Sequence, residues 1–375
     1  MQNKNSNCGT SNRYLVIFNN MPKYSGDGSY ANLVFLSNTF ETYCSVKTSL
    51  QDEDDQFLGS LILPPFNKIL KSLPSKKGSA ISKGIILLLQ KNILNSYYKK
   101  NIRHLTTDSN FVFHYLNPSI TPIRLKNDIV TIHDTFTLDL KKEHKKANIT
   151  DVYVNVTLKN LKTFKKFERI VVPSLSTKKR LVWHGFEEKN LTVIHHAADP
   201  SFYPIIDKSH LRKSLGLPED KKLILSVSSL DPRKGIDLIA EVNRKLPNDF
   251  KLVRVGKPIG DSINFINIKT NTLNKIYNAC DLFLFPTRDE GFGIPIIEAF
   301  ATLLPVVSSD IEVMKEVTRG AAVTCELDAT SLMRGIRDAI ENREILINKM
   351  KAVNPYYRIE RFSNEMNTYY TTHSY

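Results

Sequence analysis

Residues 281–298 have the sequence DLFLFPTRDEGFGIPIIE, and the rest of the chain is organised around them. The four apolar residues 282–285, bounded by Pro286, are typical of a buried strand. A loop with two glycines follows, and Pro295 then stands where the first turn of a helix tolerates a residue without an N–H. The stretch therefore predicts a strand, a glycine-containing loop and a helix.

A loop of this kind has the chemistry to hold an anion. The N-terminus of a helix presents unpaired N–H groups and a partial positive charge, and glycine lets a ligand approach the backbone closely. Glu290 lies in the loop, and Glu298 lies eight positions later on the helix, so two carboxylates are near enough to bind hydroxyl groups. A sugar attached to a diphosphate fits this combination. The alternative is an ordinary strand-to-helix loop with a solvated glutamate.

The exact order of residues in this stretch is more specific for a function than the general chemistry of its loop. The family-4 retaining glycosyltransferases carry a signature that closely resembles EGFGIPIIEA at residues 290–299, followed by LPVVSS at residues 304–309. In that family, two glutamates eight positions apart flank a G-F-G loop, and a helix of small residues leads to a P-V-V-x-S strand. The resemblance covers nearly the whole chain and is strongest from Ile224 to Ser309.

The resemblance implies a role for each residue of the signature loop. Glu298 would bind the hydroxyls of the nucleotide's ribose, and Glu290 would bind hydroxyls of the donor sugar. The sugar and the phosphate would be oriented by the N–H groups of the residues between the glutamates, which are Gly291, Phe292, Gly293 and Ile294.

Two adjacent cations are the next candidates. Arg233 and Lys234 stand before a helix predicted from Ile236, and two cations at a helix entrance suit a diphosphate, to which arginine can make a bidentate contact. A surface turn is the alternative. The resemblance implies that both residues neutralise the charge that develops on the leaving diphosphate.

Three candidate residues lie in the N-terminal half. Gly26 and Gly28 follow a predicted strand in a loop suited to close approach of a phosphate, and they match glycines of the family's N-terminal loop. His133 ends a predicted strand at 128–132, at the edge where open α/β sheets bind ligands. A lone histidine there is usually structural, but the order of elements matches the family, which implies contact with the sugar near the reacting centre.

The amino-acid composition is that of a globular protein. At 375 residues, the chain is long enough for two domains with separate cores. No apolar run reaches the length of a membrane-spanning helix, and the polar N-terminus lacks the apolar core of a secretory signal. The four cysteines are scattered without the spacing of a metal site, which favours reduced thiols and a cytoplasmic location.

The positive charge is concentrated in the N-terminal half. Residues 1–200 hold 28 Lys and Arg against 16 Asp and Glu, a net of +12 out of +14. A basic N-terminal half of this kind predicts an anionic partner. Between Phe57 and Thr107 there are bases but no acids, and the apolar segment Ile81–Tyr98 within it suits either an anionic membrane surface or a core helix with outward lysines. We find no nucleic-acid-binding module and expect no nucleic-acid partner.

Short apolar strands alternate with helices twice along the chain. The alternation predicts an α/β protein with two doubly wound, Rossmann-like domains facing each other across a cleft, which in the resembled family is the GT-B architecture. We expect an acceptor-binding domain at 1–203, a nucleotide-sugar-binding domain at 204–355, and a C-terminal helix at 356–375 that returns to the N-terminal domain. We also expect one amphipathic helix over Ser331–Met350.

The predicted function is that of a retaining hexosyltransferase, which moves a hexose from a GDP- or UDP-sugar to a glycan or lipid-linked acceptor. We expect it in the cytoplasm, or peripheral at the cytoplasmic face of a membrane. The segment Gly256–Leu273 is shorter than in most of the family and leaves the donor's base undetermined. Two alternatives remain open: a phosphorylase or epimerase of the same fold, and a catalytically silent binder of anionic lipid.

No metal and no cofactor are expected. Many transferases hold the leaving diphosphate through a divalent metal on a pair of aspartates, but here the D-x-D at Asp52 and Asp54 lies in an acidic stretch far from the signature. Fixed cations and the helix N-terminus would stabilise the leaving group instead.

Overall fold

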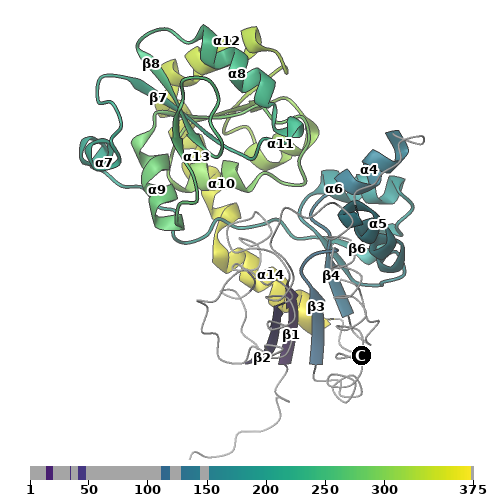
Figure 1. The fold of residues 1–375 in the computed structure, drawn as a ribbon. Coiled ribbons are helices and arrows are strands. Elements are labelled where there is room, and N and C mark those ends of the chain that lie inside the picture. Colours follow the sequence, from purple (N-terminus) through teal and green to yellow (C-terminus); the bar gives the residue numbers. More distant parts are fainter. Residues whose placement is uncertain are drawn as a thin grey trace, which may run out of the picture.

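The computed structural model describes residues 14–19, 34, 41–47, 111–118, 128–143 and 152–372. Gly26, Gly28, the pair Asp52 and Asp54, and the segment 81–98 lie outside the described residues, so their predicted roles stay predictions. The described part contains two sheets of six parallel strands, each flanked by helices (Figure 1). The predicted α/β fold with two Rossmann-like domains is confirmed.

The first sheet lies in the N-terminal half and has the strand order β2-β1-β3-β4-β5-β6. Its strands are β1 (Tyr14–Asn19), β2 (Glu41–Lys47), β3 (Phe111–Tyr115), β4 (Asp128–Thr131), β5 (Ile170–Val172) and β6 (Leu191–Val193). Its described helices are α4 (Phe136–Glu143), α5 (Val152–Phe164) and α6 (Leu175–Trp183), with a 3₁₀ turn at Glu188–Asn190. The strand order reverses between β1 and β3, and in such folds ligands bind beside the carboxyl ends of the strands at this point.

The second sheet has the order β9-β8-β7-β10-β11-β12, which is the Rossmann order. Its strands are β7 (Lys222–Val227), β8 (Phe250–Val255), β9 (Ile263–Phe265), β10 (Leu282–Phe285), β11 (Val306–Ser309) and β12 (Val323–Cys325). From β7 the chain adds strands β8 and β9 on one side, and it then adds β10, β11 and β12 on the other side. This strand-order reversal lies between β7 and β10, which are parallel neighbours. The crevice of this domain therefore lies between the loops that follow β7 and β10.

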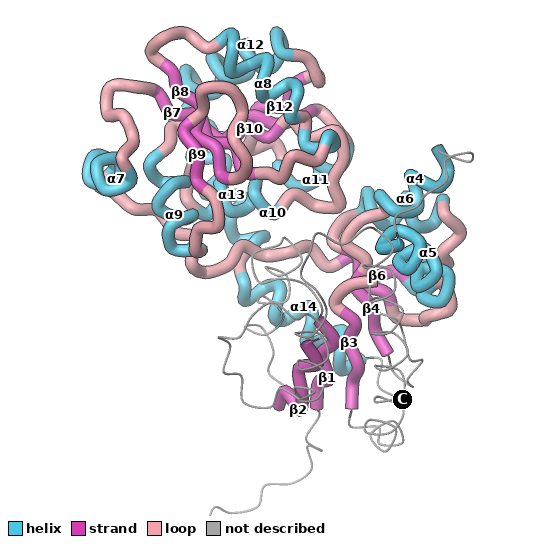
Figure 2. Tube along the Cα trace, in the orientation of Figure 1, coloured by secondary structure: helices cyan, strands magenta, loops and turns pink. Residues whose placement is uncertain are grey.

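Helices cover both faces of the second sheet (Figure 2). They are α7 (Lys208–Leu215), α8 (Ile236–Lys245), α9 (Thr270–Ala279), α10 (Ile294–Ala301), α11 (Glu312–Thr318), α12 (Ala329–Glu341) and α13 (Arg343–Val353). Two 3₁₀ turns are at Pro232–Lys234 and Asn354–Tyr357.

The prediction of a single helix over Ser331–Met350 is wrong. The segment is divided into α12 and α13 at Asn342, whose φ of −99° and ψ of 23° lie outside the helical region. The side chain of Asn342 bonds the carbonyl of Asp338, and Arg343 bonds the carbonyl of Asp281 at 2.8 Å. These contacts hold the turn, so that both helices present an apolar face to the core although their apolar positions look continuous in the sequence.

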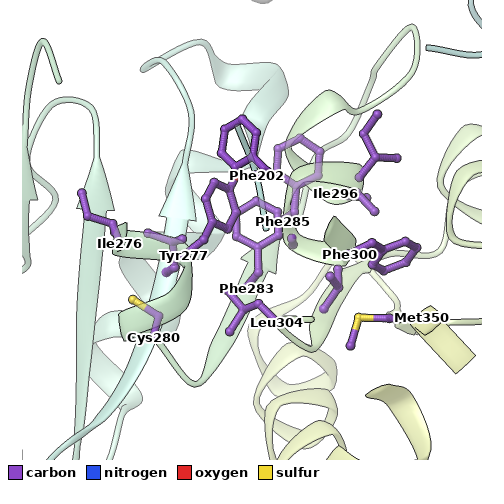
Figure 3. Packing of buried hydrophobic residues seen from close by; sticks show 14 of the residues in the cluster. Phe202, Ile276, Tyr277, Cys280, Phe283, Phe285, Ile296, Phe300, Leu304 and Met350 are labelled. Atoms are coloured by element: carbon purple, nitrogen blue, oxygen red, sulfur yellow. The ribbon is translucent and has the colours of Figure 1, made fainter. Parts of the chain in front are cut away.

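The strand that opens the signature, β10, lies at the centre of the second domain's core. All four of its residues are buried, as expected of a strand covered on both faces. Figure 3 shows Phe283 and Phe285 close to Tyr277 of α9 and to Phe202, with Phe300 of α10 nearby. The apolar run therefore anchors the loop that follows it.

The last helix, α14 (Ile359–Thr372), lies against the first sheet rather than the second (Figure 1). Its residues Phe362, Met366 and Tyr370 are buried in one cluster with Val112 and Ile129 of that sheet. The hydroxyl of Tyr370 also lies 2.8 Å from Nδ1 of His114. The chain therefore crosses between the two halves twice, while the exact domain bounds 1–203, 204–355 and 356–375 stay predictions.

Candidate active site at the domain interface

The loops after β7 and β10 are fixed against each other. Gly235 has a φ of +65°, and a Cβ there would lie 2.1 Å from the carbonyl oxygen of Pro286. The N–H of Arg288 donates to the carbonyl of Arg233 at 2.6 Å, and the hydroxyl of Thr287 donates to the same oxygen at 3.1 Å. The two loops therefore form one unit at the strand-order reversal.

Lys234 and Glu290 form an ion pair across this unit. Nζ of Lys234 lies 2.6 Å from Oε1 of Glu290, and their side chains are 19% and 13% exposed. Burial raises the pKa of Glu290, and the nearby Lys234 opposes that rise. An ammonium group has three donors, so Lys234 can hold Glu290 and still contact a phosphate oxygen. The structure therefore brings together two residues that the sequence separates by 56 positions.

Arg233 reaches from the second domain towards the first. Its guanidinium bonds Asp231 at 3.0 and 3.1 Å, lies 3.8 Å from the ring centroid of Phe136, and places Nη1 4.0 Å from a carboxylate oxygen of Asp134. Asp134 and Phe136 follow β4, beside His133. Sequence analysis missed both, although Asp134 stands directly after the histidine that it did select.

Gly291 lies in close contact with the N-terminal domain. A Cβ on Gly291 would lie 1.7 Å from the carbonyl oxygen of His133. The carbonyl of Gly291 accepts hydrogen bonds from the hydroxyls of Ser174, at 2.7 Å, and Thr177, at 3.0 Å. Nε2 of His133 donates to the carbonyl of Leu116 at 2.7 Å, which fixes the ring. His133 is therefore next to the signature loop, while its contact with the donor sugar stays a prediction.

Ion pairs extend this interface along α6. Arg180 bridges Asp139 of α4 and Asp289 of the signature loop, and Nε2 of His184 lies 2.6 Å from the other oxygen of Asp139. The ion pair between Arg180 and Asp289 therefore links the N-terminal domain to the loop, and Asp139 holds Arg180 in place. Because Arg180 and Asp289 are 109 positions apart, no local pattern could have predicted their contact.

A second contact joins α11 to the start of α6. The carboxylate of Glu316 accepts from the N–H groups of Leu175, at 2.7 Å, and Ser176, at 3.2 Å, so it satisfies free donors of the first turn of α6. It also lies 2.8 Å from Nε2 of His195. Burial opposes ionisation of Glu316, but these partners lower its pKa.

The remaining signature residues divide between packing and backbone roles. The ring of Phe292 is buried and lies 5.0 Å from the ring of His196 and 6.1 Å from that of Tyr357, so its side chain holds the interface. Gly293 has a φ of +103° and precedes α10, whose N-terminus has no side-chain cap. Ile294 is the first residue of α10. Contact of their N–H groups with a donor stays a prediction.

Glu298 lies within α10, the helix that follows the signature loop. Its side chain is only 7% exposed, and Oε2 accepts a hydrogen bond from the hydroxyl of Tyr277 at 2.8 Å. Burial raises the pKa of Glu298 to about 7. Sequence analysis missed Tyr277, because an aromatic residue in a partly apolar helix is indistinguishable from ordinary core.

Comparison with known proteins finds a family model and relatives that match part of the chain. Residues 207–356 match the family model described as "Glycosyl transferases group 1". A lipopolysaccharide core biosynthesis mannosyltransferase, LpsB of Rhizobium meliloti (strain 1021), is 33% identical over 172 residues, covering 40% of this chain and 49% of that protein. An O-antigen biosynthesis glycosyltransferase, WclY of Escherichia coli, is 28% identical over 202 residues, covering 50% of this chain and 56% of that protein. The matches thus span about half the length of these relatives.

Solved structures match over nearly the whole chain. Sucrose-phosphate synthase from Thermosynechococcus elongatus superposes with a TM-score of 0.72 at 16% identity, over 96% of this chain and 98% of that one. Anabaena Alr3699/HepE in complex with UDP-glucose superposes with a TM-score of 0.66 at 14% identity, over 94% and 98%. At these identities the likeness concerns the fold. The segment 207–356 therefore matches a group 1 glycosyltransferase domain, and the chain as a whole has the GT-B fold of these solved structures.

Proposed function

We propose that this protein is a retaining glycosyltransferase that moves a hexose from a nucleoside-diphosphate sugar to a glycan or lipid-linked acceptor. The observation that carries the proposal is the Lys234–Glu290 pair at the strand-order reversal, beside Gly291, which lies against the His133 carbonyl of the other domain. One side of the pair offers charge for a diphosphate, and the other accepts hydrogen bonds from sugar hydroxyls. Retention of configuration rests on the family resemblance.

The donor class rests on the site and on the relatives together. The HepE structure contains UDP-glucose, and LpsB is described as a mannosyltransferase of lipopolysaccharide core biosynthesis. UDP-glucose and GDP-mannose are therefore the first donors to test. The described residues contain no group of three or more His, Cys, Asp or Glu placed to hold a metal ion, and the predicted independence of metals and cofactors requires its own experiment.

Product analysis separates the proposed transferase from the other enzymes of this fold. Incubation with UDP-glucose, GDP-mannose and their common epimers, with and without inorganic phosphate, should release UDP or GDP from one donor. Phosphate-dependent formation of sugar 1-phosphate would indicate a phosphorylase, and conversion of one donor into its epimer would indicate an epimerase. Absence of all three reactions, with intact binding of anionic lipid, would support the silent binder.

Donor binding should depend on the ionisation of Glu298. A carboxylate accepts ribose hydroxyls better than a neutral acid, so donor affinity should rise by roughly tenfold between about pH 6 and about pH 8, around the pKa of about 7. Glu298→Gln should remove this pH dependence, and Glu298→Ala should weaken binding by roughly 1.5–3 kcal/mol. Titration calorimetry with UDP and GDP measures all three, and a flat wild-type profile would exclude this role.

The same group links pH to stability. Because the folded pKa of Glu298 is raised, the folded protein holds a proton that the unfolded chain releases near pH 4.3. The contribution of Glu298 is thus most favourable below the unfolded pKa and is lost as the pH rises through about 7. Thermal unfolding of the wild type relative to Glu298→Gln should show this decline.

Peripheral attachment to the cytoplasmic face of an anionic membrane is part of the proposal. Among the helices of the described residues, none is long and apolar enough to cross a bilayer. On α6, however, Leu175 and Trp183 are 52% and 63% exposed, and the side chain of Lys179 between them is 68% exposed and paired with Glu312. An aromatic residue with apolar and basic neighbours suits a lipid interface.

Co-sedimentation with liposomes tests the attachment. Binding should require anionic lipid and weaken with salt, because salt of about 0.1 M screens charges over roughly 10 Å. Trp183→Ala should reduce binding without changing donor affinity. Equal binding to neutral and anionic vesicles, or to neither, would refute the electrostatic attachment.

A further inference from the structure

Arg254 is a buried cation that pairs with no carboxylate among the described residues. Its side chain on β8 has no exposed surface, and burial is the cause that lowers its pKa to about 10. Its guanidinium bonds three neutral acceptors, which are the hydroxyl of Ser226 at 2.9 Å, the hydroxyl of Ser228 at 2.9 Å and the carbonyl of Ser228 at 3.0 Å. Nε has no hydrogen-bond partner in the described part of the chain.

Such a charge is costly to the fold. A buried charge destabilises a protein unless it is paired, and Arg212 shows the usual solution. Arg212 is also buried, but it binds Asp281 at 2.7 Å and three backbone carbonyls. Arg254 keeps its charge without that compensation, which points to a use for the charge itself.

The position of Arg254 suggests the use. It pairs in register with Ser226, near the carboxyl ends of β7 and β8, where α/β sheets bind ligands. Ser228 begins the loop that carries Arg233 and Lys234, so the buried guanidinium holds the start of that loop. A Cβ on Gly256 would lie 2.5 Å from the carbonyl oxygen of Ser228. The loop after β8 therefore lies directly against the carbonyl group that accepts a hydrogen bond from Arg254.

We propose that Arg254 is a positioning residue for the donor's diphosphate, whose buried positive charge attracts the anion and whose hydrogen bonds hold Ser228 and the loop 228–235 in place. The inference rests on the proposed function, since it assigns the anion to the leaving diphosphate. A charge surrounded by protein rather than water is weakly screened, so it acts on a bound anion without touching it. Binding of the diphosphate would in turn compensate the buried charge.

The test compares anionic and neutral parts of the donor by titration calorimetry. The probes are inorganic pyrophosphate, UDP and GDP, and the nucleosides uridine and guanosine. R254Q should bind pyrophosphate and the preferred nucleoside diphosphate about tenfold or more weakly than the wild type, since a charge-assisted interaction is lost, with less than about a twofold change for the nucleoside. R254K keeps the charge but loses the guanidinium's hydrogen bonds to Ser226 and Ser228, so it should bind pyrophosphate more weakly than the wild type and more tightly than R254Q.

K251Q is the matched control. Lys251 lies on the same strand, but it is partly exposed and is paired with Asp261 at 2.7 Å. Its replacement removes one positive charge from β8 and should leave pyrophosphate affinity unchanged. A loss equal to that of R254Q would mean that only net charge matters, and would overturn the proposal.

Other results also contradict it. Equal weakening of nucleoside and diphosphate in R254Q would show a structural role only, and equal weakening in R254K and R254Q would show that geometry rather than charge decides. Failure of both R254Q and R254M to fold would show that Arg254 serves the fold. A wild type that binds UDP or GDP, with R254Q unchanged, refutes this inference alone, whereas a wild type that binds no anionic probe refutes the proposed function with it.

Discussion

Replacement of Lys234 by alanine should lower turnover by about 10²–10³, which is the usual effect of removing one group that stabilises transition-state charge. Nζ of Lys234 lies 2.6 Å from Oε1 of Glu290 at the strand-order reversal, where a leaving diphosphate would gain negative charge. Steady-state kinetics should show a large fall in kcat and a smaller change in KM. The pH profile should also shift, because buried Glu290 loses the cation that opposes the rise of its pKa.

Lys245→Ala provides the control. Lys245 lies at the end of α8, the helix that follows Lys234, and its partly exposed side chain pairs with Glu241. Its replacement should leave kcat within about twofold, since surface ion pairs contribute roughly 0–1 kcal/mol. A fall in turnover no larger for Lys234→Ala than for Lys245→Ala would remove Lys234 from the mechanism.

Gly291→Ala should reduce kcat/KM by about 100-fold while leaving both domains folded, because misplacement of a site by about 1 Å has effects of that size. The new Cβ would lie 1.7 Å from the carbonyl oxygen of His133, so the signature loop and the N-terminal domain must separate. The carbonyl of Gly291 would then lose its bonds from Ser174 and Thr177. Kinetics, circular dichroism and small-angle scattering together measure the activity, the folding and the domain separation.

Gly216→Ala separates this steric effect from the general cost of losing a glycine. Gly216 has a φ of +65° at the end of α7, and a Cβ there meets nothing within 4 Å. Its replacement should lower stability by roughly 1–2 kcal/mol through backbone strain and leave kcat/KM almost unchanged. If Gly291→Ala behaved in the same way, the observed contact between the domains would not be needed for activity.

The signature loop was predictable because its determinants are local. Four apolar residues specify the strand β10, Gly293 and Pro295 specify the helix start, and the spacing of Glu290 and Glu298 follows from the same short stretch. The short strands were harder to predict from the sequence. β2, β9 and β12 escaped prediction, because three to seven residues without strong alternation carry little signal on their own.

Contacts between distant parts of the chain could not be predicted from local pattern. Tyr277 has the sequence context of a core residue, and only the fold brings its hydroxyl to Glu298. Arg254 lies on β8, where sequence alone gives no sign that Ser226 of the neighbouring strand and Ser228 of the loop after it accept hydrogen bonds from its guanidinium. The bridge from Arg180 to Asp289 likewise depends on how the two domains meet.

The central claim is that fixed cations at the strand-order reversal, rather than a bound metal, stabilise the leaving diphosphate. The most direct measurement is the rate of sugar transfer, with the donor identified by product analysis, in excess EDTA and again after addition of Mg²⁺ or Mn²⁺. We predict that the rate in EDTA equals the rate without it and that added metal leaves it unchanged, while Lys234→Ala is slow under both conditions. Abolition of transfer by EDTA and its recovery with Mg²⁺ or Mn²⁺ would contradict the roles given to Arg233 and Lys234.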